Sequence, residues 1–398
     1  MNNEIELVVK RKFIDKYKKG FPLILKEAIL NIHDLAKEGE MCKLTTEDGE
    51  FIGRGYLGAQ NKGYGWVLTT KEHQKIDEGF FFHKIGYAIQ KRTELYNCED
   101  TNAFRVFNGE GDGIGGLTIE KFDKYYLINW YSKGIYEFKE MVVTALTSMV
   151  EYEGIYHKKR FEEGGKYVEE DSFLCGEQAP EPLIVKENGE KFAIYLNEGA
   201  MVGVFLDQRD VRKTLRDKYS KGKTVLNTFS YTGAFSIFAA KGGACKTTSV
   251  DLANRSLPKT REHFEINDIN PDNQNIVVQD IFEYFRDAQM NGLKFDVVVL
   301  DPPSFATSKK YRFSADKNYG DIVKSAIEIT NKNGIIIAST NCANFDMKKF
   351  KGFIQSAFDE MDSKYKIVEE FQLPSDFVVN SNFPEGNYLK VLFLKVLK

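Results

Sequence analysis

Several features that mark large protein classes are missing from this sequence. Its five cysteines are scattered and odd in number, and they form neither a Cys-x-x-Cys pair nor a cluster with histidine at metal-ligand spacing. A disulfide scaffold and a structural zinc site are therefore both disfavoured. No run approaches about eighteen apolar residues, and the first residues do not join a basic segment to an apolar one. These absences predict a cytoplasmic protein without a metal or a membrane partner.

An excess of basic residues is missing too. The chain of 398 residues has 55 Lys and Arg against 58 Asp and Glu, a net charge of −3. This total argues mildly against a nucleic-acid partner, although local patches can still provide a binding surface. The charge is uneven, because residues 1–75 carry +2, residues 76–185 carry −8 and residues 186–398 carry +3. Any RNA is expected along the two positive segments and away from the acidic surface at 162–171.

The hydrophobic pattern divides the chain into three predicted domains at these same boundaries. Residues 1–75 form short alternating segments between turns, which is typical of a small β-rich domain. Residues 76–185 mix a helical stretch with strand-like segments and predict an α+β domain. From residue 186 onward strands alternate with helices, and nearly continuous apolar runs suit strands buried on both faces of a parallel sheet. The C-terminal part is therefore predicted to be a doubly wound, Rossmann-like α/β domain.

The ends of the predicted strands carry the polar residues of this last domain. In an open α/β sheet, ligands bind at the carboxyl ends of the strands, around the point where strand order reverses. The first strand runs into residues 227–235, and the next three end in aspartates. The expected strands are Thr224–Thr228, Thr247–Asp251, Asn275–Val278, Phe295–Asp301 and Gly334–Thr340.

The first strand end argues against a dinucleotide cofactor. A pyrophosphate site is expected to carry Gly-x-Gly-x-x-Gly, whereas this turn has the single glycine Gly233. An adenosyl cofactor without phosphates fits better. S-adenosylmethionine needs a turn for its amino-acid end, a carboxylate for its ribose and a polar partner for its adenine, which Gly233, Asp251 and Asp280 could supply. Each aspartate taken alone could equally be a helix N-cap.

The fourth strand end is the most specific element. In Asp301-Pro-Pro, each proline fixes φ and removes an N–H, so the aspartate and the carbonyls face the cleft without competing bonds. This arrangement suits the planar, amino-bearing edge of a nucleobase. Two groups of cations interleaved with aromatics are candidate RNA contacts, with a solvated surface as an equal alternative. These candidates are Lys10, Arg11, Lys12, Lys309, Lys310 and Arg312.

The motifs at 227–235, 249–251, 301–305 and 383–390 resemble those of class I S-adenosylmethionine-dependent RNA methyltransferases. They are most similar to the bacterial 23S rRNA cytosine-C5 methyltransferases that carry an N-terminal PUA domain. The likeness extends to the middle segment, so it covers nearly the whole chain. It implies a PUA-like domain before the central and catalytic domains, and a single-stranded or locally opened 23S rRNA partner. It leaves the oligomeric state open, a homodimer included.

The resemblance also implies which residues line the cofactor cleft. One departure is the turn at 199–203, Gly-Ala-Met-Val-Gly, where the family has Gly-Gln-Lys-Thr-Gly, so no contact is assigned there. The implied residues are Asn227, Phe229, Ser230, Tyr231, Gly233, Asp251, Asn267, Asp280 and Asp301, bordered by Asp207, Gln208 and Arg209.

A second departure concerns the mechanism. Cytosine C5 is a weak nucleophile, so such enzymes add a cysteine thiolate to C6 before methyl transfer. In this chain Thr340 stands where the family has that cysteine, and Cys342 follows two residues later. Cys342 is thus the candidate nucleophile, with a buried, inert cysteine as an equal alternative, and Asp301 is expected to orient the base.

Three other functions fit parts of the sequence. Methylation of an exocyclic amine or ring nitrogen needs no covalent adduct, and Thr340 would then be no loss. A non-catalytic RNA-binding or ribosome-assembly factor could keep the cofactor fold without turnover. A nicotinamide oxidoreductase is the most distant alternative, because the phosphate-binding glycines are missing.

Overall fold

A computed structural model describes residues 4–31, 37–59, 61–163, 166–167, 172–199, 201–307 and 312–397. Its contacts divide the chain into two compact units. Unit 1 comprises Met1–Val185, Ile194–Val202 and Ser375–Gly386, and unit 2 comprises Lys186–Ala193, Gly203–Pro374 and Asn387–Lys398. The chain therefore leaves unit 2 twice for short stretches, which the sequence pattern did not indicate.

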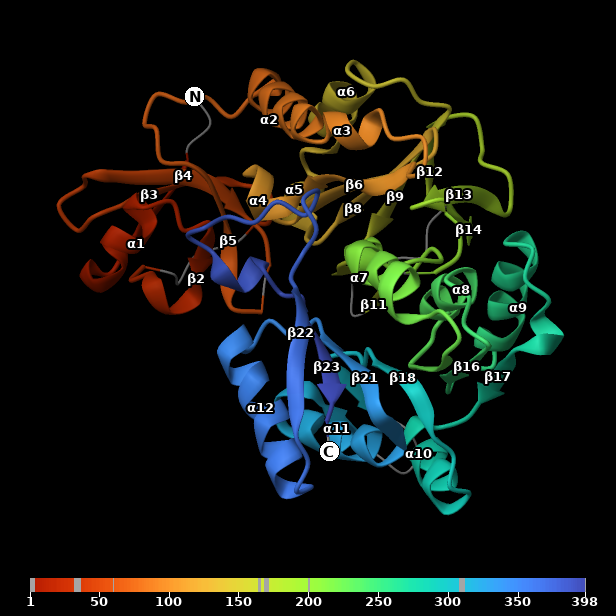
Figure 1. The fold of residues 1–398 in the computed structure, drawn as a ribbon. Coiled ribbons are helices and arrows are strands. Elements are labelled where there is room, and N and C mark those ends of the chain that lie inside the picture. Colours follow the sequence, from red (N-terminus) through yellow and green to blue (C-terminus); the bar gives the residue numbers. More distant parts are fainter. Residues whose placement is uncertain are drawn as a thin grey trace. The chain divides into compact units, whose positions relative to one another are not determined.

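Unit 1 begins with a five-stranded sheet of order β1-β3-β4-β5-β2 (Figure 1). β1 and β3 pair in parallel, and β3 and β4 form a hairpin whose connection contains Asp48-Gly49. Gly49 supplies the positive φ of 83° that this turn requires. The N-terminal segment is thus β-rich as expected. The strands are β1 (Ile5–Val8), β2 (Leu23–Leu25), β3 (Met41–Thr45), β4 (Phe51–Leu57) and β5 (Gly63–Thr69).

A second five-stranded sheet of unit 1 has the order β12-β9-β8-β7-β6. Both sheets share one hydrophobic cluster, which includes Leu44 and Ile128. The glycine-rich connection after β6 contains one helical turn, α4, before β7 begins. The strands are β6 (Ala103–Asn108), β7 (Leu117–Phe122), β8 (Tyr125–Trp130), β9 (Gly154–Lys159) and β12 (Phe173–Gly176), and two-residue strands β10 (Glu162–Glu163) and β11 (Lys166–Tyr167) pair separately.

Six helices accompany these sheets among the described residues of unit 1. α2 begins at an Asp77 cap, whose side chain accepts a hydrogen bond from the Phe80 N–H, and buries one face against the core. The helices are α1 (Ile14–Lys18), α2 (Glu78–Lys91), α3 (Thr93–Tyr96), α4 (Gly109–Asp112), α5 (Lys133–Tyr136) and α6 (Lys139–Thr147).

Unit 2 is built on a seven-stranded sheet of order β17-β16-β15-β18-β21-β23-β22, and a short hairpin, β13 (Leu183–Glu187) and β14 (Glu190–Ile194), precedes it in the chain. All neighbours pair in parallel except β23, which is antiparallel to β21 and β22. Strand order reverses between β15 and β18, as in a doubly wound fold. The strands are β15 (Thr224–Thr228), β16 (Lys246–Asp251), β17 (Asn275–Val278), β18 (Phe295–Leu300), β21 (Thr330–Thr340), β22 (Tyr365–Phe371) and β23 (Lys390–Val396), with β19 (Phe305–Thr307) and β20 (Arg312–Ser314) forming a separate hairpin.

Helices cover both faces of this sheet (Figure 1). Leu226 of β15 packs in the cluster that contains side chains of α10, α11 and α12, whereas its neighbour Val225 packs with α7 and α8 on the other face. This burial on two faces explains the continuous apolar runs of the central strands. The helices are α7 (Arg209–Thr214), α8 (Ala234–Lys241), α9 (Ser256–Ile266), α10 (Ile281–Met290), α11 (Ala315–Ile329) and α12 (Met347–Glu360).

A buried ion pair fastens the elements of unit 1. The guanidinium of Arg92, after α2, makes two hydrogen bonds of 2.9 and 2.7 Å to Asp112 of α4, and the two side chains are 0% and 1% exposed. The same guanidinium donates to the main-chain oxygens of Arg105 and Asp376. Arg92 therefore ties α2, α4 and β6 to the segment Ser375–Gly386.

Removing one partner of this pair is expected to destabilise the protein strongly. Arg92→Leu leaves the Asp112 carboxylate buried without its main partner, which costs about 3–5 kcal/mol of unfolding free energy. Denaturant unfolding at pH 7 measures the loss. Lys18→Gln removes an exposed partner of Glu50 and is expected to change nothing measurable. A loss below about 1 kcal/mol for Arg92→Leu would contradict the role assigned to the pair.

Candidate active site

The parallel register of unit 2 brings the predicted strand ends together. Thr228 pairs with Val250 on one side and with Leu300 on the other, and Leu300 pairs with Ala338. The residues that follow these positions therefore lie side by side along the carboxyl edge of the sheet, at the point where strand order reverses.

The turn after β15 has an unusual backbone. Phe229 and Tyr231 have φ angles of 52° and 50°, in the left-handed region that bulky residues rarely adopt. Hydrogen bonds hold this conformation, because the Ser230 N–H donates to Val250 O at 3.0 Å and the Tyr231 N–H donates to Asp251 Oδ2 at 2.9 Å. Strain of this kind tends to be retained at functional sites.

Gly233 ends this turn, and two observations show that the position needs glycine. Its φ is 81°, and a Cβ there would lie 2.6 Å from Cγ2 of Thr260 in α9. No side chain caps the N-terminus of α8, which begins at the next residue. The sequence predicted a close backbone approach at Gly233, and in the structure the approach is between α8 and α9.

The Asp251 carboxylate accepts two hydrogen bonds from the main chain and can still accept others. Its Oδ1 accepts the Ala253 N–H at 2.9 Å, and its Oδ2 accepts the Tyr231 N–H. A carboxylate offers about four lone-pair sites, so two remain for a ligand. Because the side chain is partly exposed at the strand end, its geometry fits a ribose diol.

Asp280 and Asn227 have structural partners. Asp280 caps α10, with Oδ1 accepting the N–H groups of Phe282 and Glu283, so the N-cap alternative applies to it. Asn227 is 1% exposed and donates to Ser236 Oγ at 3.1 Å.

Asn267 does not join the strand-end group. It follows α9, which returns the chain toward the amino edge of the sheet, and its amide makes two 2.8 Å hydrogen bonds with the main chain of Lys191 and one with His263 O. Its role toward the cofactor stays a prediction that no contact supports.

Asp301 and Gln208 form the polar centre of the site. Gln208 lies in the 3-10 turn Leu206–Gln208, and its Nε2 donates to Asp301 Oδ1 at 3.0 Å and to Ser339 Oγ at 2.7 Å. Burial raises the pKa of Asp301 from 3.8 to about 6, and nearby Asp207 adds to the rise. Hydrogen bonds from Ser339 and Gln208 and the charge of Arg212 oppose it.

The amide oxygen of Gln208 has no donor among the described residues, although the side chain is 3% exposed. An ionised Asp301 accepts only, so the amide nitrogen must face it and the oxygen must face away. A buried acceptor without a donor costs about 1–3 kcal/mol, which a ligand amino group would relieve. Next in the chain, Arg209 is buried at the start of α7, and Asp207 accepts a hydrogen bond from Tyr388 at 2.9 Å.

The end of β21 carries Thr340 and Cys342. Cys342 is 3% exposed, and its N–H donates to Thr340 Oγ1 at 3.2 Å. Lys390 pairs with Thr340 across β23, is also buried, and donates to Tyr388 O at 2.7 Å. Burial lowers the pKa of Lys390, and its attraction to Cys342 and Asp346 opposes that shift.

The candidate RNA contacts lie on separate segments. Arg11 and Lys12 are exposed in the turn Arg11–Phe13, while Lys10 Nζ donates to Glu27 O. Arg312 is exposed at the start of β20. Lys309 and Lys310 fall outside the described residues, as does much of the acidic surface at 162–171.

Sequence reasoning missed two residues of the site. Ser339 stands near the end of β21, where it accepts a hydrogen bond from Gln208, and its hydroxyl carries no motif of its own. His263 of α9 accepts the Ala193 N–H at Nε2 and contacts Thr232 O through Nδ1, so it braces the strained turn as a neutral imidazole. Burial lowers its pKa in agreement with that state. The strand-end rule could have found Ser339, whereas no local signal marks His263.

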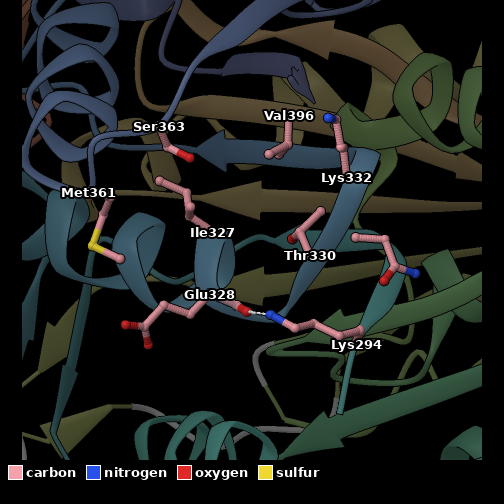
Figure 2. Close-up of a pocket in the computed structure, with 9 residues that line it drawn as sticks. Lys294, Ile327, Glu328, Thr330, Lys332, Met361, Ser363 and Val396 are labelled. Carbon is pink, nitrogen blue, oxygen red and sulfur yellow. Dashed lines mark hydrogen bonds between the residues drawn. The ribbon is translucent and has the colours of Figure 1, made fainter. Parts of the chain in front are cut away.

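A cavity of about 440 Å³ lies at the opposite edge of the sheet. Thr330, which begins β21, lines it together with Lys294 and Ser363, and Figure 2 shows Lys294 reaching the main-chain oxygen of Glu328. It is therefore separate from the strand-end site. Within the described part of the chain no three His, Cys, Asp or Glu residues are grouped to hold a metal ion. No helix of that part is both long and apolar enough to cross a membrane.

Comparison with known proteins identifies the family of the chain. The model of S-adenosylmethionine-dependent methyltransferases matches residues 164–383, more than half of the chain. The chain belongs to this family. Residues 7–70 match the model of PUA-like domains. The predicted fold class and the predicted cofactor, S-adenosylmethionine, are thereby confirmed, and the chain is an S-adenosylmethionine-dependent methyltransferase.

Individual relatives match over nearly the full length. YwbD of Bacillus subtilis, provisionally named a ribosomal RNA large subunit methyltransferase, is 55% identical over 391 residues, which is 98% of this chain and 99% of the relative. Ribosomal RNA large subunit methyltransferase I of Aliivibrio fischeri is 32% identical over 96% of each chain. A crystal structure of the methyltransferase SMU.776 complexed with SAH has 38% identity and a TM-score of 0.91, covering 98% of this chain and 100% of that one.

Asp301→Asn is expected to stabilise the protein at high pH. A folded-state pKa of about 6 against 3.8 means that the group favours folding at low pH and that this contribution is lost as pH rises through 6. The variant should therefore gain roughly 3 kcal/mol at pH 8 and less than about 1 kcal/mol at pH 4. Denaturant unfolding at both pH values measures the difference.

Asp296→Asn is the matched control with the opposite sign. Burial alone would raise the pKa of Asp296, but hydrogen bonds from Thr224 and Asn331 outweigh burial and hold it below 3.8. This variant should lose stability at pH 8. If Asp301→Asn also loses stability at pH 8, the assigned cost of burying Asp301 is wrong.

Proposed function

We propose that the chain methylates a base of 23S rRNA, at C5 of a cytosine. The observation that carries the proposal is the acceptor pair of Asp301 and Gln208, placed where strand order reverses in a chain 55% identical to a protein named as a large-subunit rRNA methyltransferase. The PUA-like match at residues 7–70 supports RNA as the substrate.

The turn after β15 and the end of β16 fit the cofactor. Gly233 leads into the uncapped N-terminus of α8, whose free N–H groups suit the carboxylate of an amino acid. Asp251 has acceptor sites left for the ribose. Phe229 and Tyr231 fix the path of the turn between them. When bound there, S-adenosylmethionine supplies an electrophilic methyl group.

Asp301 and Gln208 are suited to hold an amino-bearing base. The carboxylate and the unpartnered amide oxygen both accept hydrogen bonds, and the exocyclic amine of cytosine offers two N–H donors. Uracil has a carbonyl at that position and would leave both acceptors unmatched. A base can reach this site only from single-stranded or locally opened RNA.

Cys342 is the proposed nucleophile for C5 chemistry. Its thiolate would add to C6, C5 would take the methyl group, and loss of the C5 proton would then expel the thiolate. Lys390, which pairs with Thr340 across β23, interacts electrostatically with this cysteine.

Methylation at a base nitrogen is the second candidate, and the burial of Cys342 favours it. A thiol on a side chain that is 3% exposed must move before it can attack a base. The equally buried Gln208 must also move before its amide oxygen can accept from one, so C5 transfer needs both movements and transfer to nitrogen needs one. Transfer to the amine held by Asp301 and Gln208 needs no such attack.

Mapping of rRNA modifications tests the function. Cells that lack the protein should lose one methyl group from 23S rRNA by mass spectrometry, and the wild-type gene should restore it. Asp251→Ala should fail to restore it, because the ribose and the turn both lose their carboxylate. Asp272→Ala, which removes an exposed carboxylate paired with Arg261, is the control and should restore it. An unchanged modification map would refute the proposal.

Trapping with RNA that contains 5-fluorocytosine separates the two chemistries. Fluorine at C5 cannot leave as a proton does, so a C5 mechanism stops at the covalent adduct, visible as a shifted band on a denaturing gel. Cys342→Ser should abolish the adduct, whereas Cys245→Ser, the same change at an exposed cysteine, should keep it. Methyl transfer without any adduct would support the base-nitrogen alternative instead.

A further inference from the structure

Helix α2 of unit 1, labelled in Figure 1, carries cationic and aromatic residues along one side. Lys84, Tyr87 and Lys91 are spaced i, i+3 and i+7, so they share one side of the helix. Lys91 Nζ lies 4.6 Å from the centre of the Tyr87 ring, and Tyr87 is 59% exposed. Together with Lys71, which follows β5 and acts on Lys84, these residues are called the α2 stripe.

The lysines of the α2 stripe repel one another. Burial lowers the pKa of Lys84, and the positive charges of Lys91 and Lys71 lower it further. Asp112 opposes this shift, but it already accepts two hydrogen bonds from Arg92 and one of 3.3 Å from Lys91. The three lysines share one carboxylate, Asp112, which is already hydrogen-bonded, so the α2 stripe keeps a net positive charge. A polyanion that approached the stripe would relieve the repulsion among the lysines.

Two features point to single-stranded nucleic acid as this polyanion. Lysines beside an exposed aromatic ring are the combination that holds phosphates and stacks a base. The stripe also stands out from its surroundings, because residues 76–185 carry −8 in total. Such a background repels RNA except at the stripe, and would hold the strand to one path.

We propose that the α2 stripe binds a single-stranded segment of the rRNA substrate, with phosphates on the three lysines and one base on the ring of Tyr87. The proposal rests on the proposed function for the identity of the RNA. It adds a contact in the middle segment to the two positive segments, and the expectation that RNA avoids the acidic surface at 162–171 stays a prediction.

Salt dependence of RNA binding tests the lysines. The affinity of the full-length protein for a labelled, unstructured RNA is measured by fluorescence anisotropy at about six KCl concentrations between 50 and 300 mM. The triple variant Lys71→Gln, Lys84→Gln, Lys91→Gln should bind at least about tenfold more weakly at low salt. Each phosphate contact contributes about 0.7 to the steepness of the plot of log affinity against log salt concentration, so the loss of three contacts should lower the slope by about 2.

A second triple variant controls for net charge. Lys124→Gln, Lys218→Gln and Lys351→Gln remove the same charge from lysines that are each paired with a surface glutamate. This variant should keep the wild-type slope. If both triple variants lower the slope equally, the effect is one of total charge and the α2 stripe is not a binding site.

Tyr87 is tested separately, because its exposed ring contributes little to folding. Tyr87→Ala should weaken RNA binding by about 5- to 100-fold through lost stacking, and Tyr87→Phe should bind as the wild type does. Equal binding by all three would overturn the stacking contact. If the variants lose affinity for ribosomal particles but not for protein-free RNA, the partner is a protein and the proposal is wrong.

The two proposals fail in different ways. Wild-type protein that transfers methyl groups to rRNA, while the lysine variants bind RNA normally, would overturn the α2 stripe alone. Wild-type protein that neither binds nor methylates rRNA would overturn the proposed function and the α2 stripe with it.

Discussion

The parallel register of β15, β18 and β21 is the constraint on which the site depends. Once Thr228, Leu300 and Ala338 are partners, the residues beyond them share one edge of the sheet. The Asp251 carboxylate can then accept a hydrogen bond from the turn after β15, and Gln208 can bridge the ends of β18 and β21. A shift of one residue in the strand register would point these polar side chains away from the strand-end site and toward the helices that cover the sheet.

The site is held in an arrangement that is costly for the fold. A carboxylate with a pKa of about 6, an unpartnered amide oxygen and two bulky residues at positive φ each oppose stability. Neutral His263 and the helices on both faces of the sheet hold the turn in place. Their packing and hydrogen bonds offset the free-energy cost of the strained and buried groups. This distribution is typical of a preorganised binding site.

Charge in unit 1 acts locally rather than as a sum. Arg92 and Asp112 neutralise each other in the core, so Asp112 is a shared counter-charge for the lysines around it. The middle segment is the most acidic of the three, yet it holds the α2 stripe. Net charge by segment therefore predicts solubility better than it predicts where a polyanion binds.

The sequence by itself determined five of the seven strands in the sheet of unit 2, their burial on two faces and the aspartates at three strand ends, because apolar period and turn chemistry are local. It did not indicate β22 and β23. β15 and β17 were predicted to the residue. The tertiary structure alone decided that the Asn267 amide bonds the main chain of Lys191 and that Gln208 links Asp301 to Ser339. Gln208 and Ser339 are 131 residues apart in the chain, and only strand order and register bring them within hydrogen-bond distance.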